Sequence, residues 1–151
     1  MSQTSERAST VSVEKPWSDP ARFPSRAMAI ADLGIVAALH DDVFGPGALT
    51  RAAYRVREGH GPLSPYCRVL CDGGTVIAAI KYTAITIGGR ADALMLGPLM
   101  VAGRYGSQGH GRRLISESLK AARDGGIKLV LLVGDAPYYA RFGFQPVLPM
   151  G

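Results

Sequence analysis

A glycine-rich stretch in the C-terminal half of the chain could bind a phosphate group. Its glycines are Gly106, Gly109 and Gly111, and they lie between an apolar run and the start of a helical pattern. Glycine lets the main chain pass close to a ligand, and the unpaired N–H groups of a helix start suit a pyrophosphate. Arg112 and Arg113 follow at once, where the helix dipole disfavours positive charge, so their positions favour a bound phosphate. The pattern predicts an anion site; the alternative is an ordinary glycine-rich connection with two solvated arginines.

Two well-known phosphate-binding loops do not fit this stretch. The Walker loop needs a Gly-Lys pair, which occurs nowhere in the sequence. The dinucleotide fingerprint G-x-G-x-x-G would need a glycine at position 114 after Gly109 and Gly111, and the chain has Leu114 there. We therefore exclude both of these nucleotide-binding classes.

Periodicity and turn signals predict the elements that position the glycine-rich stretch. The predicted helices cover 32–44, with Asp32 as a cap, then 48–58, 109–124 and a short segment at 135–139. The predicted strands cover 23–28, 67–71, 75–87, 93–101, 127–133 and 144–147. Gly-rich turns join the three central strands into an antiparallel meander. A β-α-β crossover follows, and its aliphatic second strand at 127–133 is of the type covered on both faces.

Composition indicates a globular protein of one domain. The chain has 151 residues with a net charge of +5, 47% hydrophobic residues and 19% charged residues, which is less polar than a disordered chain. Residues 1–20 are rich in Ser and Thr and are expected to form a flexible arm before a domain over 21–151. The longest uncharged apolar window, 93–103, is too short to cross a bilayer, and no signal pattern begins the chain. We expect a cytoplasmic protein.

The two cysteines, Cys67 and Cys71, lie four positions apart on a predicted strand. That separation is too long for a disulfide, and no histidine cluster accompanies them. We interpret both as small buried thiols and expect no metal.

The glycines have the order G-x-x-G-x-G and follow a strand interrupted by Pro98. With these features the sequence resembles the GNAT superfamily of acetyl-CoA-dependent N-acetyltransferases over about 23–147. Residues 96–101 look like the fourth strand of the family, 106–111 like its pyrophosphate loop, and 135–144 like its last passage from helix to strand. Together with 131–134, that last segment is especially similar to a bacterial acetyltransferase subgroup whose substrates are unsettled.

The resemblance implies an α/β (α+β) fold with a mixed sheet of about six strands and helices on both faces. It also implies acetyl-CoA as the cosubstrate, held along the fourth strand and the glycine loop. The Leu99 amide would polarise the thioester carbonyl. The residues that would contact the cofactor, mostly through the backbone, are Leu99, Met100, Val101, Gly106, Ser107, Gln108, Gly109, His110, Gly111 and Arg112. Arg113 is an optional further partner for the pyrophosphate.

Tyr139 stands where the family usually has a tyrosine general acid, which would protonate the departing thiolate of coenzyme A. The alternative is that Tyr138 and Tyr139 are both packing aromatics. The general base stays open among His40, Asp41, Asp42, Asp92 and a chain of waters. His40 is on the apolar face of its predicted helix and is expected to be a satisfied structural histidine. His110, where the family usually has an aliphatic residue, is taken as a local variation rather than a catalyst.

Two departures from the family pattern stand out. Gly106 occupies a position that the family commonly fills with Gln or Arg, so one side-chain contact to the cofactor is absent. The chain ends after the predicted sixth strand, so we expect it to lack the family's seventh strand and to leave an exposed edge. Such an edge favours pairing with a second copy of the chain.

Three functions compete at this point. The first is acetyl transfer from acetyl-CoA to a primary amine of a small molecule, peptide or protein, by direct attack in a ternary complex. The second is a non-catalytic acyl-CoA-binding module. The third, a basic nucleic-acid-binding protein, rests on the charge of +5 and on several arginines in the second predicted helix. The sequence has no nucleic-acid-binding motif and no aromatic stacking platform, which disfavours the third.

Overall fold

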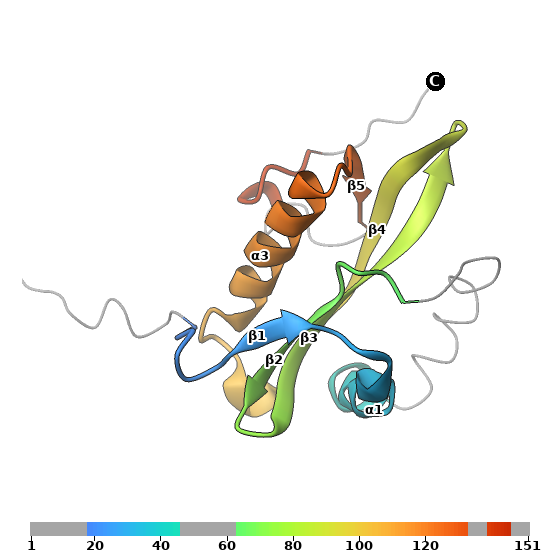
Figure 1. Cartoon of the computed structure of the whole chain (residues 1–151). Coiled ribbons are helices and arrows are strands. Elements are labelled where there is room, and N and C mark those ends of the chain that lie inside the picture. The colour runs from blue at the N-terminus through green and yellow to red at the C-terminus, as the bar shows by residue number, and fades with distance from the viewer. Residues whose placement is uncertain (1–17, 46–62, 133–138, 146–151) are drawn as a thin grey trace, which may run out of the picture.

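One sheet with the strand order β1-β2-β3-β4-β5 organises the chain (Figure 1). The computed structural model describes residues 18–45, 63–132 and 139–145. The strands are β1 (Ser25–Ala27), β2 (Arg68–Asp72), β3 (Thr75–Ile87), β4 (Arg90–Val101) and β5 (Leu129–Leu131). The helices are α1 (Leu33–Phe44) and α3 (His110–Asp124), with the single 3-10 turns η2 (Ile30–Asp32) and η3 (Gly103–Tyr105).

Strands β1 to β4 pair antiparallel, and β5 returns parallel to β4 after α3. Two-residue glycine turns close both long hairpins, and Gly88 and Gly89 adopt positive φ angles of 57° and 83° that favour such turns. The predicted meander and β-α-β crossover are therefore confirmed. The described sheet has five strands rather than about six, because Phe144 and Gln145 lie outside it.

Several predicted segments lie wholly or partly outside the described residues. They are the arm at 1–20 except its last residues, the helix at 48–58, most of the helix at 135–139 and the second half of the strand at 144–147.

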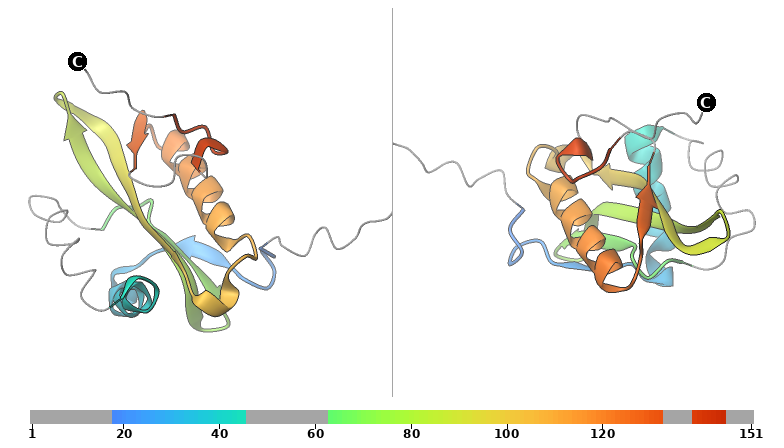
Figure 2. Two further views of the ribbon diagram at one scale, coloured as in Figure 1. Left: turned by 180° about the vertical axis from the view of Figure 1, so that it is seen from behind. Right: turned by 90° about the horizontal axis from the view of Figure 1, so that it is seen from above.

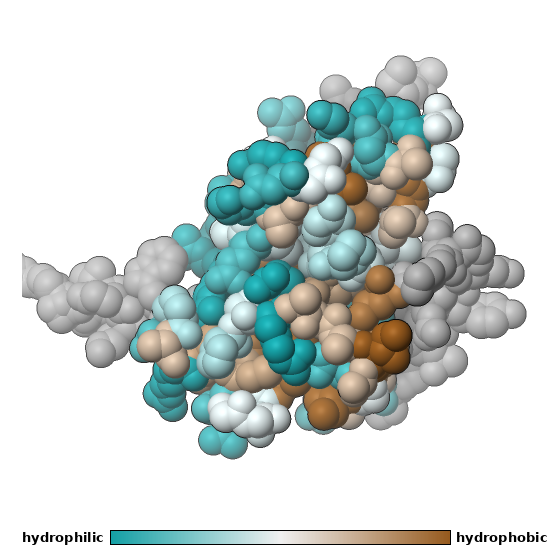
Figure 3. All heavy atoms as spheres, in the orientation of Figure 1, coloured by the Kyte–Doolittle hydropathy of each residue, from teal (hydrophilic) through white to brown (hydrophobic). Residues whose placement is uncertain are grey.

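The two helices cover opposite faces of the sheet, as predicted (Figure 2). Helix α1 packs on β3 and β4, and α3 packs on β2, β3 and β4. The largest fully buried side chains join these layers; they include Leu70, Ile77, Ile80, Met100, Leu114 and Ile115. Apolar side chains remain exposed mainly on η2 and α1, which form the brown area at the lower right of Figure 3. Within the described residues, no helix is long and apolar enough to cross a membrane.

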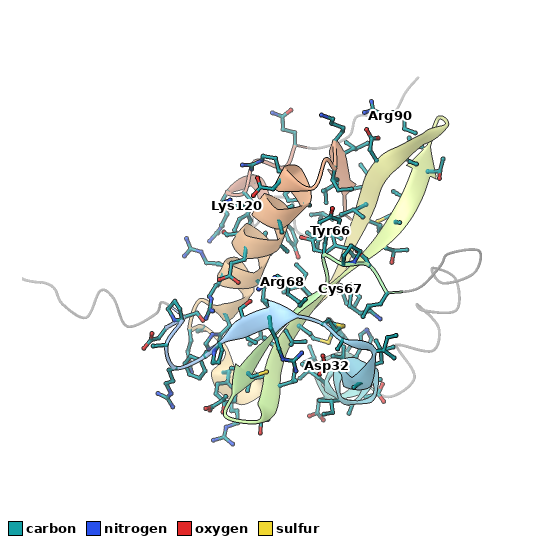
Figure 4. All side chains as sticks on the ribbon, in the orientation of Figure 1. Asp32, Tyr66, Cys67, Arg68, Arg90 and Lys120 are labelled. Carbon is teal, nitrogen blue, oxygen red and sulfur yellow. The ribbon has the colours of Figure 1, made fainter. Side chains whose placement is uncertain are left out.

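Both cysteines are free and buried, as expected. Cys67 lies just before β2, near the centre of the sheet (Figure 4). Its sulfur accepts a hydrogen bond from the Tyr82 amide at 3.2 Å, and burial raises the pKa of the thiol. A protonated, enclosed thiol is a packing group rather than a nucleophile.

Strand β5 corrects the expectation that the aliphatic run at 127–133 is covered on both faces. Leu129 is 40% exposed, and Val130 and Leu131 are only half-buried. The strand has three residues and forms an edge of the described sheet, paired to β4 only. An aliphatic run at an edge is therefore not sufficient evidence for two-sided burial.

Asp32 occupies the N-cap of α1, but its side chain makes no cap hydrogen bond. Its carboxylate instead accepts two hydrogen bonds from the Arg26 guanidinium, at 2.7 and 2.9 Å, and one from the Ala29 amide at 2.7 Å (Figure 4). The preceding turn η2 puts Asp32 in a helical conformation, from which its side chain reaches backwards. The bond from Arg26, together with the Ala29 amide, lowers the pKa of Asp32 to about 2.

Asp32→Asn should lower the melting temperature at pH 7 by about 3 to 6 °C, since a charge-assisted, partly buried bond contributes about 1.5 kcal/mol. A lowered folded-state pKa gives stability that is present above the unfolded value of 3.8 and is lost as the pH falls through about 2. The difference in melting temperature between wild type and Asp32→Asn should therefore shrink from pH 4 to pH 2. Asp42→Asn, at an exposed position of α1, is the control; a constant difference across this range would contradict the role of Asp32.

Candidate functional site

Strand β4 has an open edge beside the second half of its length. It pairs with β3 up to Val101, whereas β5 pairs with it only over Ala93, Leu94 and Met95. The register to β3 shifts where Gly97 and Pro98 stand opposite the single residue Lys81, which is a β-bulge. Among the described residues, the edge of β4 beyond Met95 thus has no strand partner on the β5 side. Its main-chain polar groups can bind an extended ligand there.

The start of α3 forms the second half of the site. Gly109 is the N-cap residue with a left-handed φ of 85°, and no side chain caps the helix. The Arg113 amide makes the first helical bond, to the Gly109 carbonyl at 3.0 Å, so the amides before it have no partner within the helix. No acidic residue lies in the first turn of α3. The positive end of the helix dipole therefore has no counter-charge within the first turn of α3, and it favours an anion.

An open cleft of about 340 Å³ connects the edge of β4 to the start of α3. The residues that line it are Leu99, Val101, Tyr105, Gly106, Ser107, Gly109, His110, Gly111 and Arg112. The structure thus brings together all the residues predicted to contact the cofactor except Met100 and Gln108. Met100 is 1% exposed and belongs to the core, while the Gln108 side chain turns toward His110.

Tyr105 lines the cleft without having been predicted. Its hydroxyl donates a hydrogen bond at 2.6 Å to Asp72, the last residue of β2, and this bond raises the pKa of Tyr105. The ring also packs against Phe23 at 6.1 Å between centroids. No motif marks Tyr105, since its contacts come from residues far away in the sequence.

Arg113 makes hydrogen bonds within the protein, contrary to the expectation that it could contact a pyrophosphate. Its Nε donates to Glu117 at 2.9 Å, and its Nη1 donates to the Phe23 carbonyl at 2.7 Å and to the Ser18 hydroxyl at 2.9 Å. The side chain is only 12% exposed. Arg113 therefore attaches the segment before β1 to α3, and Arg112 is the arginine that lines the cleft.

His110 is the first residue of α3 and is buried. Its ring Nδ1 is 2.8 Å from the Ser18 hydroxyl, and the Phe23 ring packs edge-on against it at 4.8 Å. Burial and the charge of Arg113 lower the pKa of His110, so the imidazole is neutral at pH 7. These contacts hold the His110 ring in the interior. The interpretation of His110 as a non-catalytic variation stays a prediction.

Tyr139 belongs to a cluster of aromatic side chains. It belongs to the helical turn at 139–140 and packs against Phe142 and Phe144, with centroid distances of 6.4 and 5.9 Å. It is partly buried against the core. Tyr139 does not line the cleft, so its role as general acid stays a prediction.

None of the side-chain candidates for the general base lines the cleft. His40 is buried as expected, and its ring packs against Phe44 at 4.7 Å. Its Nδ1 has no hydrogen-bond partner among the described residues, which differs from the expectation of a satisfied histidine. Burial lowers the pKa of His40. Asp92 is bound to Arg90 near the outer end of the β3–β4 hairpin, and Asp41 and Asp42 are exposed on α1. The general base stays open.

No group of three or more His, Cys, Asp or Glu side chains that could hold a metal ion occurs within 18–45, 63–132 and 139–145.

Comparison with known proteins gives concordant results. The family model "Acetyltransferase (GNAT) domain" matches residues 25–147. The uncharacterized N-acetyltransferase YjhQ of Escherichia coli is 36% identical over 76 residues, which is 48% of this chain and 42% of YjhQ. The uncharacterized N-acetyltransferase YhbS of Escherichia coli is 34% identical over 76 residues, 49% of this chain and 45% of YhbS. The match spans less than half the length of either relative.

Solved structures are similar over a larger part of the chain. A crystal structure of YhbS from Escherichia coli in complex with CoA has a TM-score of 0.72 and 30% identity, and the match covers 85% of this chain and 72% of that one. A GNAT family acetyltransferase from Brucella melitensis in complex with acetyl-CoA has a TM-score of 0.68 and 27% identity. This match covers 85% of this chain and 92% of that one.

Proposed function

This chain belongs to the GNAT acetyltransferase family, and from that premise we propose that it transfers an acetyl group from acetyl-CoA to a primary amine. The observation that carries the proposal is the cleft between the open edge of β4 and the uncapped start of α3. One end of this cleft suits an amide-containing extended chain, and the other suits a pyrophosphate. Coenzyme A has both parts in one molecule, which favours it over a simple phosphate ligand.

The pantetheine arm lies along β4, where Leu99 and Val101 line the cleft, and it occupies the main-chain groups that β5 leaves unpaired. The pyrophosphate accepts hydrogen bonds from amides of the loop at 107–111, since the Gly106 amide already donates to the Gly103 carbonyl at 3.1 Å. Arg112 lies at the same end of the cleft and adds positive charge.

The reaction is a direct acyl transfer. The neutral amine attacks the thioester carbonyl carbon, a C–N bond forms, and the electron pair of the C–S bond leaves with sulfur. The Leu99 amide stabilises the negative charge on the carbonyl oxygen. Tyr139 donates its hydroxyl proton to the departing thiolate, and the proton lost by the amine restores the phenol through solvent or a base. The acceptor is an amine of a small molecule, peptide or protein.

Acetyl-CoA should raise the melting temperature of the purified chain by about 5 to 10 °C. A ligand at 100 times its dissociation constant that binds only the native state adds about 2.7 kcal/mol, which corresponds to such a shift at this chain length. Free adenosine diphosphate is the control for nonspecific phosphate binding. A cooperative melt that acetyl-CoA leaves unchanged would contradict the proposal.

Turnover is measured separately, as thiol release from acetyl-CoA over a panel of primary amines. Acetylation of at least one amine class supports the enzymatic function. Tight acetyl-CoA binding without turnover over a broad panel would instead indicate a non-catalytic acyl-CoA-binding module.

A further inference from the structure

A chain of side-chain hydrogen bonds connects the segment before β1 to the glycine-rich loop. Arg113 Nη1 lies 2.9 Å from Ser18 Oγ, Ser18 Oγ lies 2.8 Å from His110 Nδ1, and His110 Nε2 lies 3.3 Å from Gln108 Oε1. Ser18 and His110 are both buried and stand 92 positions apart in the sequence. This series of hydrogen bonds ends at Gln108, in the loop that forms one end of the cleft.

The direction of each bond follows from the donors available. An arginine can only donate, so the Ser18 oxygen accepts from Arg113, and the Ser18 hydroxyl proton is free to point at His110 Nδ1. Nδ1 is then unprotonated, and the ring proton is on Nε2, which donates to the Gln108 carbonyl oxygen. In this arrangement Ser18 both accepts and donates, and both ring nitrogens of His110 have partners. Burial and the nearby guanidinium disfavour a second proton on the ring.

The loop at the end of this series of hydrogen bonds has an unfavourable backbone conformation at Ser107. Ser107 has a φ of 61°, which is rare for a residue with a side chain. Such dihedral angles persist only where surrounding contacts hold them. His110 is anchored on one side by Ser18 and on the other by Gln108, so it fixes the residues on both sides of Gly109. The Phe23 ring supports the imidazole from a third direction.

We propose that Ser18 and His110 are positioning residues for the anion-binding loop. Through the chain Arg113 to Ser18 to His110 to Gln108 they hold the loop amides in the orientation that receives the pyrophosphate of acetyl-CoA. A loop held in its bound shape loses less conformational freedom on binding. The inference rests on the proposed function, since it assigns these residues to acetyl-CoA binding at the same cleft.

The first test measures acetyl-CoA affinity by isothermal titration calorimetry. Ser18→Ala should weaken acetyl-CoA binding about tenfold and raise KM. It should leave kcat nearly unchanged, since neither Ser18 nor His110 touches the reacting atoms. Ser18→Thr keeps the hydroxyl and should restore affinity to within about threefold of wild type. Ser64→Ala is the matched control: Ser64 is 9% exposed against 8% for Ser18, and its oxygen also accepts a hydrogen bond, from the Tyr66 amide. Equal affinities for Ser18→Ala and Ser64→Ala would overturn the inference.

A second test reads the hydrogen-bond chain directly. Nitrogen NMR of histidine-labelled protein has only three histidines to resolve, and His110→Leu identifies the relevant signal. We expect the Nε2–H tautomer of His110 in the wild type, and a mixture of tautomers in Ser18→Ala. The Nδ1–H tautomer in the wild type would reverse the bonds and overturn the chain. If Ser18→Ala does not fold, Gln108→Ala removes the half-buried far end of the chain and should weaken acetyl-CoA binding by about threefold or more.

The two proposals fail in different ways. If the wild type does not bind acetyl-CoA at all, the proposed function is wrong, and the positioning role with it. If the wild type binds and Ser18→Ala binds equally well, only the positioning role is wrong.

Discussion

Gly111→Glu should weaken acetyl-CoA binding by about a hundredfold or more without destabilising the fold. Gly111 is the second residue of α3 and lines the cleft. A carboxylate there competes for the helix amides, and at a separation of about 5 Å it would repel a bound pyrophosphate by about 3 kcal/mol at an effective dielectric constant of 20. The same substitution suits the helix, because glutamate is a better helix former than glycine and complements the dipole in the first turn. The melting temperature without ligand should therefore stay the same or rise.

Gly111→Gln is the matched control for this prediction. Glutamine has nearly the shape of glutamate without its charge, so it should cost only the steric part of the effect. The difference in affinity between the two variants measures the electrostatic part, and it should shrink as salt is added. Calorimetric titrations that give equal affinities for the Glu and Gln variants would show that the start of α3 does not hold the phosphates.

Tyr139→Phe should lower turnover by about a hundredfold or more while leaving acetyl-CoA affinity nearly unchanged. The substitution removes only the hydroxyl that protonates the departing thiolate. The ring stays in place against Phe142 and Phe144, so packing and stability should hardly change. An effect on kcat without an effect on binding is the signature of an interaction made in the transition state.

The measurement is steady-state thiol release with a competent amine, accompanied by calorimetric binding of acetyl-CoA. Tyr138→Phe, the same substitution at the neighbouring position, serves as the control and should keep wild-type turnover. Full activity of Tyr139→Phe would place Tyr139 among the packing aromatics. A loss of activity in Tyr138→Phe alone would move the acid to the neighbouring residue.

The features that could be predicted from the sequence are those that depend on neighbours a few positions apart. Turn glycines and alternating β-branched residues predicted the hairpin at 88–89 and the meander around it. The glycine order before a helical pattern predicted the start of α3, and the resemblance to the GNAT superfamily implied most residues of the cleft. Backbone preferences and side-chain periodicity act over one or two turns of chain, so they can be read from a single sequence.

Contacts between distant segments were decided only by the tertiary structure. The predicted cap at Asp32 failed for a more local reason, because Arg26 and the Ala29 amide, six and three positions away, bind its carboxylate instead. Arg113 was an optional partner for a pyrophosphate, yet its Nη1 donates to Ser18 and to the Phe23 carbonyl from the other end of the chain.

The sequence by itself therefore determined the order of the described elements and the presence of a glycine-rich loop at the start of α3. Only the tertiary structure decided which side chains line the cleft beside that loop, as Tyr105 and His110 do, and which are withdrawn from it, as Arg113 and Met100 are. The physical reason is that a hydrogen-bond partner 92 positions away, as between Ser18 and His110, leaves no periodic trace in the sequence. Such hydrogen bonds form when the helices and the sheet pack together, because buried polar groups then need partners within the protein.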